Sequence, residues 1–208
     1  MVAETTPFEI PKPEPLVIVI SGPSGVGKDA VIKRLKERNL PMHFVITATT
    51  RPPRTGEKDG VDYFFVTREQ FEGMIGRGEL LEHTLVYTDY KGIPREQVRR
   101  ALDSGKDVIM RLDVQGAATV HGLCSEAILI FLTPKNEAEL SQRLYERRSE
   151  TNESLTLRIQ TARAEIKRLD EYDYVVENAQ GRLDEAVDQI IAIITAEHRR
   201  VHQRKATL

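Results

Sequence analysis

Short apolar runs alternate with amphipathic stretches along most of the chain. Five stretches rich in aliphatic and aromatic residues predict strands at 16–21, 42–48, 107–113, 127–132 and 174–177. Six stretches with helical spacing or a capping pattern predict helices at 30–36, 95–104, 116–121, 136–148, 154–167 and 183–200. Strands that alternate with helices form a parallel sheet covered on both faces, so the pattern predicts the α/β class.

The segment 47–100 does not follow this alternation. It begins with a loop rich in proline and glycine at 49–60, followed by a predicted strand at 62–66. Thr67 and Gln70 have the spacing of a capping box, which predicts a helix to about residue 77. Two short strands are expected between 80 and 90. The segment is therefore predicted to form an inserted β-rich lobe.

A glycine-rich turn joins the first predicted strand to the first predicted helix. Its residues are Gly22, Pro23, Ser24, Gly25, Val26, Gly27, Lys28 and Asp29. The glycines let backbone N–H groups converge on one anion, and the helix N-terminus presents its positive dipole end to the same place. Lys28 adds a charge for the β- and γ-phosphates. This order of strand, turn and helix predicts a phosphate-binding P-loop, although the motif has serine or threonine where this chain has Asp29.

Composition excludes several other classes of protein. The 208-residue chain has a formal net charge of −2, so no basic field points to nucleic acid. No apolar run reaches the roughly 18 residues of a membrane span, and a single cysteine, Cys124, excludes an intrachain disulfide. Residues 1–15 lack the apolar core of a secretory signal and are expected to be a disordered lead-in. A cytoplasmic location is predicted, with a plastid or the mitochondrial matrix as the alternative if a transit segment was trimmed.

Charged residues at three places are candidates for phosphate chemistry. Asp113 ends an apolar strand, where the acid of a second P-loop motif holds water on Mg²⁺ or binds a substrate hydroxyl. Arg51 and Arg54 flank two prolines that stiffen the loop, and two guanidinium groups at a set separation suit a phosphate monoester. Four arginines are candidates for a mobile lid over the transferred group, namely Arg143, Arg147, Arg148 and Arg158. An ordinary turn residue or a solvated charged face is the alternative at each place.

Several motifs together resemble guanylate kinase. The loop Gly-Pro-Ser-Gly-Val-Gly-Lys is followed by Thr-Thr-Arg-Pro-Pro-Arg-x-Gly-Glu at 49–57 and by Gly-x-Asp-Tyr-x-Phe-Val at 60–66. Leu-Glu-His, Asp-Val-Gln-Gly and an arginine- and glutamate-rich stretch follow at 81–83, 113–116 and 147–158. The resemblance covers 16–197, and the arginine loop is more specific than the P-loop alone.

The resemblance implies a nucleoside monophosphate kinase with a P-loop core built on a five-stranded parallel sheet. Within a domain of 16–208, the core takes in 16–46, 101–142 and 168–200. A GMP-binding lobe at 47–100 and a helical lid at 143–167 complete it. The implied reaction converts ATP and GMP (or dGMP) into ADP and GDP with Mg²⁺, in a monomer or homodimer whose partners are these small molecules.

The resemblance also implies roles for residues that match its motifs. The implied substrate-binding residues are Thr47, Arg51, Arg54, Glu57, Tyr63, Glu82 and Asp113. Among them, Glu82 accepts hydrogen bonds from guanine N1–H and the 2-amino group, which adenine does not offer. The implied catalytic residues are Lys28, Arg51, Arg147 and Arg158. The loop 22–29 and Asn178 would bind ATP, and Asp29 and Asp113 are the predicted metal ligands, since carboxylate oxygen suits Mg²⁺.

Four positions depart from the family's pattern. Asp29 replaces serine or threonine, and Lys91 and Ile93 stand where tyrosine and a hydroxyl residue are usual. Arg111 stands where an acid is common, two residues before Asp113. No role is carried over to positions 91, 93 and 111, so guanine recognition is expected to be looser or rebuilt with other groups.

Two other readings remain open. A non-catalytic guanylate-kinase-like binding module generally lacks an intact phosphate loop, so Lys28 and the lid arginines argue against it. A related P-loop kinase for another phosphorylated substrate, such as a ribose bisphosphate, would lack Glu82 and the combination of Arg51 with Tyr63. A GTPase is disfavoured because the chain has no Asn-Lys-x-Asp motif.

Overall fold

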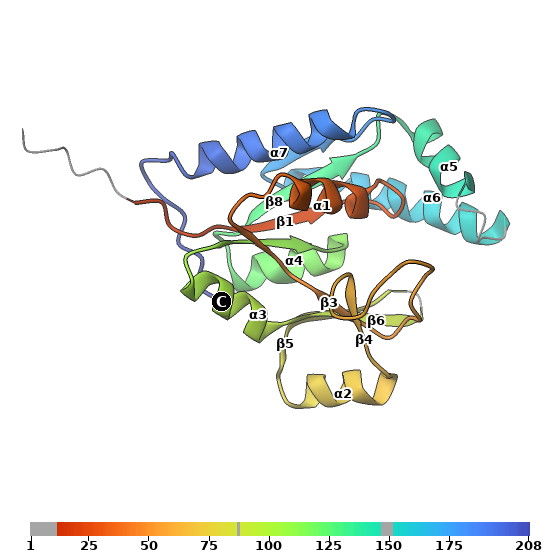
Figure 1. Ribbon diagram of the computed structural model, residues 1–208. Helices are drawn as coiled ribbons and strands as arrows, with labels where there is room; N and C mark the ends of the chain where they lie inside the picture. The colour runs from red at the N-terminus through yellow and green to blue at the C-terminus, as the bar shows by residue number, and fades with distance from the viewer. Residues whose placement is uncertain (1–11, 87, 147–151) are drawn as a thin grey trace, which may run out of the picture.

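The computed structural model describes residues 12–86, 88–146 and 152–208 (Figure 1). Most of the predicted lead-in, 1–11, lies outside these residues, and 12–15 have no regular secondary structure. Within the described ranges, no helix has the length and apolar character needed to cross a membrane.

Five parallel strands form the core sheet in the order β2-β7-β1-β8-β9. They are β1 (Val17–Ser21), β2 (Met42–Phe44), β7 (Asp107–Arg111), β8 (Ile128–Thr133) and β9 (Tyr174–Glu177). The central strand β1 is buried along its whole length, which explains its unbroken aliphatic run. The prediction of an α/β fold with a five-stranded parallel sheet is confirmed.

Helices cover both faces of this sheet. Figure 1 shows α1 (Lys28–Glu37) and α7 (Leu183–Glu197) on one face, with α3 (Arg95–Asp103) and α4 (Val114–Leu123) on the other. Alternate residues of β1 serve the two layers, because successive side chains of a strand point to opposite faces. Those at 18 and 20 pack with α1 and α7, and those at 17 and 19 pack with α3 and α4.

A second, four-stranded sheet is inserted between β2 and α3. Its order is β4-β3-β6-β5, formed by β3 (Thr47–Thr49), β4 (Tyr63–Phe65), β5 (Leu80–Val86) and β6 (Asp89–Pro94). Helix α2 (Arg68–Gly76) starts at the predicted capping box and packs on this sheet through Phe71, which stacks on Tyr90 with ring centres 5.1 Å apart.

The predicted single strand at 42–48 is wrong, because the chain passes from one sheet to the other within it. β2 ends at Phe44 in the core sheet, and β3 starts at Thr47 in the inserted sheet. Between them, the side chain of Gln97 replaces a neighbouring strand: it accepts from the backbone N–H of Ile46 (3.0 Å) and donates to the Ile46 carbonyl (2.9 Å). One side chain from α3 therefore satisfies the backbone where the two sheets separate.

The remaining helices lie near the carboxyl ends of the core strands. α5 (Glu137–Glu146) and α6 (Asn152–Ile166) pack together through Leu140, Leu144 and Ala162. A short 3₁₀ helix, η1 (Leu169–Glu171), leads into β9 and was not expected from the sequence. Three helices start two residues earlier than predicted, α1 at Lys28, α4 at Val114 and α6 at Asn152.

Candidate active site

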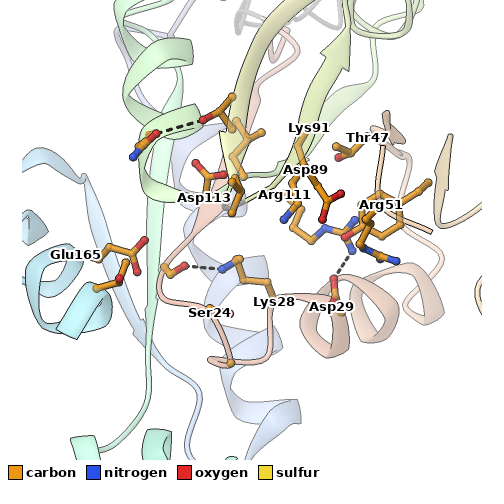
Figure 2. A pocket seen from close by; sticks show the side chains of 18 of the residues that line it. Ser24, Lys28, Asp29, Thr47, Arg51, Asp89, Lys91, Arg111, Asp113 and Glu165 are labelled. Atoms are coloured by element: carbon orange, nitrogen blue, oxygen red, sulfur yellow. Dashed lines mark hydrogen bonds and ion pairs between the residues drawn. The ribbon is translucent and has the colours of Figure 1, made fainter. Parts of the chain in front are cut away.

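The candidate site lies outside the carboxyl ends of the parallel strands, where open α/β sheets bind their ligands. The phosphate loop follows β1, Asp113 follows β7 and Asn178 follows β9. A cavity of about 340 Å³ opens between the core, the inserted sheet and α6 (Figure 2).

Thirteen of the predicted site residues line this cavity: Gly22, Ser24, Gly25, Gly27, Lys28, Asp29, Thr47, Arg51, Arg54, Tyr63, Glu82, Asp113 and Arg158. Among the described residues, Pro23, Val26, Glu57 and Asn178 are not on its wall. Arg147 lies outside the described residues, as does Arg148. The fold thus brings together side chains from both sheets and from α6.

The phosphate loop has the backbone geometry of an anion site. Gly22 has a φ of +132°, and a Cβ there would lie 2.3 Å from the carbonyl oxygen of Leu132, so only glycine fits. The N-cap of α1 is Gly27, which has no side chain to cap the helix, and the first N–H groups of a helix are the ones that bind anions. Asp29 lies in the first turn of α1 and forms an ion pair with Arg111.

Lys28 is folded back over the loop. Its Nζ donates to the carbonyl oxygens of Gly22 and Pro23, the latter at 3.1 Å. Burial lowers the pKa of Lys28 to about 8, although the nearby carboxylates of Glu165, Asp29 and Asp113 oppose this shift. The lysine is therefore mostly cationic at neutral pH and poised to exchange carbonyl partners for phosphate oxygens.

Two buried polar groups on the wall formed by the inserted sheet have no partner within the described structure. Glu82 on β5 is 3% exposed, and neither of its carboxylate oxygens forms a hydrogen bond there; the same holds for Oγ1 of Thr47. Burial, reinforced by the charge of Asp113, raises the pKa of Glu82 to about 8, while Lys91 opposes the shift. Buried groups left unpaired in this way are costly, so a polar ligand is expected here.

The room beside Glu82 depends on a glycine from another element. A Cβ at Gly116, in the first turn of α4, would lie 3.1 Å from Oε2 of Glu82. Larger residues at 116 would press on the carboxylate, which explains the glycine in the Asp-Val-Gln-Gly motif.

Arg51 is held in a fixed orientation by two neighbours. Its guanidinium group forms two hydrogen bonds with Glu57, at 2.7 and 2.6 Å, and its Cζ lies 4.6 Å from the ring centre of Tyr63. Glu57 also accepts from the backbone N–H of Arg54 at 2.8 Å. Glu57, which the resemblance groups with the substrate-binding residues, thus faces away from the cavity and positions Arg51.

Comparison with known proteins agrees with this geometry. The family model described as guanylate kinase matches residues 14–197. The chain is 52% identical over 199 residues to "Guanylate kinase 2, chloroplastic/mitochondrial" of Oryza sativa subsp. japonica, covering 95% of this chain and 70% of that protein. The chain belongs to the guanylate kinase family.

Two further relatives extend this result. A guanylate kinase of Halalkalibacterium halodurans is 48% identical over 187 residues, covering 90% of this chain and 91% of the relative. The crystal structure of guanylate kinase from Anaplasma phagocytophilum superposes with a TM-score of 0.77 at 30% identity, covering 91% and 89% of the two chains. Both likenesses extend over nearly the whole domain.

The predicted metal ligands of this guanylate kinase family member are both engaged in the protein. Asp113 caps α4, with its Oδ1 accepting from the Gly116 N–H at 2.8 Å, and Asp29 pairs with Arg111. In the described part of the chain, no three His, Cys, Asp or Glu residues group to hold a metal. Mg²⁺ does not require such a group, because it keeps several waters and binds one or two carboxylates plus substrate phosphates. The donor set fits Mg²⁺ through Asp113, with Oδ1 already used.

A second hollow, of about 410 Å³, lies on the other side of the phosphate loop. Asn178 lines it and donates from Nδ2 to the Val26 carbonyl at 2.8 Å. Arg143 donates to the same carbonyl at 3.0 Å and to the Asn178 carbonyl at 2.7 Å. These two side chains hold the phosphate loop from the side of the second hollow. Arg143 therefore lines this hollow and not the main cavity.

Helix α6 forms one side of the cavity and contacts the phosphate loop. Arg158 donates to Oγ of Ser24 at 3.2 Å, and Glu165 faces Lys28 across the cavity (Figure 2). Burial raises the pKa of Glu165, and the charge of Lys28 opposes this shift.

Four charged residues of the cavity wall received no role from sequence reasoning: Lys91, Arg111, Asp89 and Glu165. The first two were visible as departures from the family's pattern, since each places a cation where the family has another residue type. Glu165 gave no signal, because it reads as one more charge on an amphipathic helix.

Proposed function

We propose that this chain transfers the γ-phosphoryl group of ATP to GMP or dGMP, forming ADP and the corresponding nucleoside diphosphate. The observation that carries this proposal is Glu82, buried and without a hydrogen-bond partner among the described residues, in a cavity that also contains the phosphate loop and the fixed guanidinium group of Arg51. Membership of the guanylate kinase family supports it.

Guanine recognition is assigned to Glu82 and Thr47. A carboxylate is an acceptor only, and guanine presents two adjacent donors, N1–H and the 2-amino group. Adenine presents an acceptor at N1, which would leave the buried carboxylate unpaired. Thr47 Oγ1, also without a partner in the described structure, supplies a further contact to the base.

The phosphate of GMP is assigned to Arg51, Arg54 and Tyr63. Glu57 and the Tyr63 ring already fix the guanidinium of Arg51, so little conformational freedom is lost when the phosphate binds. The acceptor oxygen is thereby directed toward the phosphate loop, where Lys28 contacts the donor phosphates.

Transfer is an in-line displacement at phosphorus. An oxygen of the GMP phosphate attacks the γ-phosphorus while the bond to the β–γ bridging oxygen breaks, and that oxygen leaves with ADP. The negative charge spread over the moving group is stabilised by Lys28, Arg51 and Arg158, with Arg147 as a further predicted cation. Arg158 already contacts the loop at Ser24, and closure of α6 excludes water from the site.

Mg²⁺ accompanies ATP and supplies neutralisation of the phosphate charge when bound. Asp113 would hold it through water at Oδ2. Asp29, the second residue predicted as a metal ligand, already pairs with Arg111 through one carboxylate oxygen. On the other side of the loop, Asn178 and its hollow are assigned to the adenosine part of ATP.

A nucleoside monophosphate panel tests this function. ADP release is measured with ATP, Mg²⁺ and GMP, dGMP, AMP, CMP or UMP in turn. GMP and dGMP are expected to be phosphorylated, and the other three to react at least about 100-fold less efficiently. GMP binding without ADP release would instead identify a non-catalytic binding module, and equal rates with AMP would contradict the assignment of Glu82.

The affinity for GMP is expected to rise with pH. Guanine binds the carboxylate form of Glu82, but in the free protein its pKa is about 8, so binding at lower pH must first release a proton. The dissociation constant should therefore fall by up to about tenfold per unit between pH 6.5 and 8 and then level off. Calorimetry in buffers of different ionisation enthalpy measures the released proton, and Glu82→Gln should abolish both effects.

The compartment and the assembly remain predictions. A cytoplasmic location is proposed, and the likeness to a relative named chloroplastic/mitochondrial keeps an organelle as the alternative. A monomer or homodimer is proposed, with ATP and GMP as the small-molecule partners.

A further inference from the structure

Arg111 connects the phosphate loop to the residues proposed to bind GMP phosphate. It is the last residue of β7, its side chain is 16% exposed, and it lines the cavity. Its guanidinium group pairs with Asp29 in the first turn of α1 (Figure 2). The same group lies 4.5 Å from the ring centre of Tyr63, the ring that Arg51 contacts at 4.6 Å.

Positive charge is concentrated around this ring. Arg51 and Arg111 both approach it, and Lys91 on β6 lines the same wall. Burial lowers the pKa of Lys91, and the two arginines lower it further, whereas Asp113 and Asp29 oppose the shift. Such a group of desolvated cations is stabilised when an anion enters among them.

Stability of the free protein does not account for the ion pair. The side chain of Asp29 is 59% exposed, and pairs with an exposed partner contribute little to folding. The pair does, however, restrict the guanidinium group of Arg111 to one place on the cavity wall, facing Tyr63.

We propose that Arg111 binds the phosphate of the acceptor nucleotide and that Asp29 positions it for this contact. The inference rests on the proposed function, because it assumes GMP as the acceptor. Two planar guanidinium groups, Arg51 and Arg111, then hold the phosphate from neighbouring directions, one fixed by Glu57 and the other by Asp29. Asp29 thus acts as a positioning residue for a second arginine.

Calorimetric titration with GMP, without ATP or Mg²⁺, tests the contact directly. Arg111→Gln is expected to weaken GMP binding by roughly 10- to 100-fold, the loss of charge-assisted hydrogen bonds. Arg111→Lys should fall between this variant and the native protein, because it keeps the charge but loses the planar fork. Guanosine, used as a competitor, lacks the phosphate, so its affinity should be the same in all three proteins.

A matched control comes from the residue that caps the C-terminus of α1. Arg38 forms ion pairs with Asp188 and Asp184, away from the cavity, and Arg38→Gln makes the same change of charge. This variant should bind GMP as the native protein does. Unchanged GMP binding by Arg111→Gln, or an equal loss for GMP and guanosine, would overturn the proposed contact.

The positioning role of Asp29 is tested by asking whether the effect of its substitution on GMP binding requires Arg111. Asp29→Asn is expected to weaken GMP binding by about three- to tenfold in the native background and to have no effect when added to Arg111→Gln. In turnover assays with saturating nucleotides, the half-saturating Mg²⁺ concentration of Asp29→Asn should equal that of the native protein. A raised Mg²⁺ requirement with unchanged GMP binding would overturn the positioning role and make Asp29 a metal ligand.

Turnover of the native protein with ATP and GMP distinguishes a failure of this inference from a failure of the proposed function. Absence of turnover with ATP and GMP would reject the proposed function. Normal native turnover with unaltered GMP binding by Arg111→Gln would reject only the role of Arg111.

Discussion

Glu82→Gln is expected to remove the preference for GMP over AMP. Glutamine offers one acceptor and two donors, so it cannot accept from both N1–H and the 2-amino group of guanine. Each buried polar group left unmatched costs about 1–3 kcal/mol, which predicts a loss of about 10²- to 10³-fold in kcat/KM for GMP. The ratio of kcat/KM for GMP and AMP is the quantity to measure, and an unchanged ratio would reject the assignment.

Glu82→Gln should remain folded and should be more stable than the native protein at alkaline pH. The pKa of Glu82 is about 8 in the folded protein, above its ordinary value of 4.5, so the free energy of unfolding falls as pH rises between these values. Removing the carboxylate should therefore raise the melting temperature at pH 8.5, with a smaller difference at pH 6. Glu79→Gln changes an exposed carboxylate one position before β5 and is the control for both measurements.

Lys28→Met is expected to lower kcat by about 10³-fold or more while the dissociation constant for GMP changes little. The lysine is desolvated beside the loop, where its charge acts on the donor phosphates more strongly than it would in water. Methionine retains much of the side-chain volume but carries no charge. Single-turnover rates and GMP calorimetry separate the chemical step from acceptor binding.

The matched variant is Lys33→Met, because Lys33 lies on the exposed face of the same helix. It should retain native turnover. A comparable loss in both variants would point to damage to α1 instead of a role in transfer, and retention of kcat by Lys28→Met would contradict the proposed mechanism.

The features that the sequence predicts correctly are those determined by short stretches of chain. The phosphate loop is a local motif of strand, glycine-rich turn and helix, so its residues predict an anion site, although the close approach of the Leu132 carbonyl to Gly22 is not visible in the sequence. The capping box at Thr67 is equally local and marks the start of α2 correctly. The alternation of strands and helices requires only the burial of apolar runs, and the parallel core sheet follows from it.

Features that depend on distant segments were not predicted. The division of 42–48 into two strands depends on Gln97, about 50 positions later, which replaces a strand neighbour. The pairing of Asp29 with Arg111 joins residues 82 positions apart, so the sequence showed two unexplained departures instead of one interaction. Arg51 and Glu57 are close in sequence. Their ion pair was nevertheless not predicted, because it depends on how the proline-rich loop folds over the ring of Tyr63.

The carboxylate of Glu82, which has no hydrogen-bond partner among the residues that the structure describes, has a consequence for the lifetime of the protein in the cell. A ligand that satisfies this group binds only the folded state, so GMP raises the free energy of unfolding with the logarithm of its concentration once that concentration exceeds the dissociation constant. Starvation for the nucleotide would leave more molecules open to proteases, and plentiful GMP would protect them. The abundance of the protein would then follow its substrate without any change in gene expression.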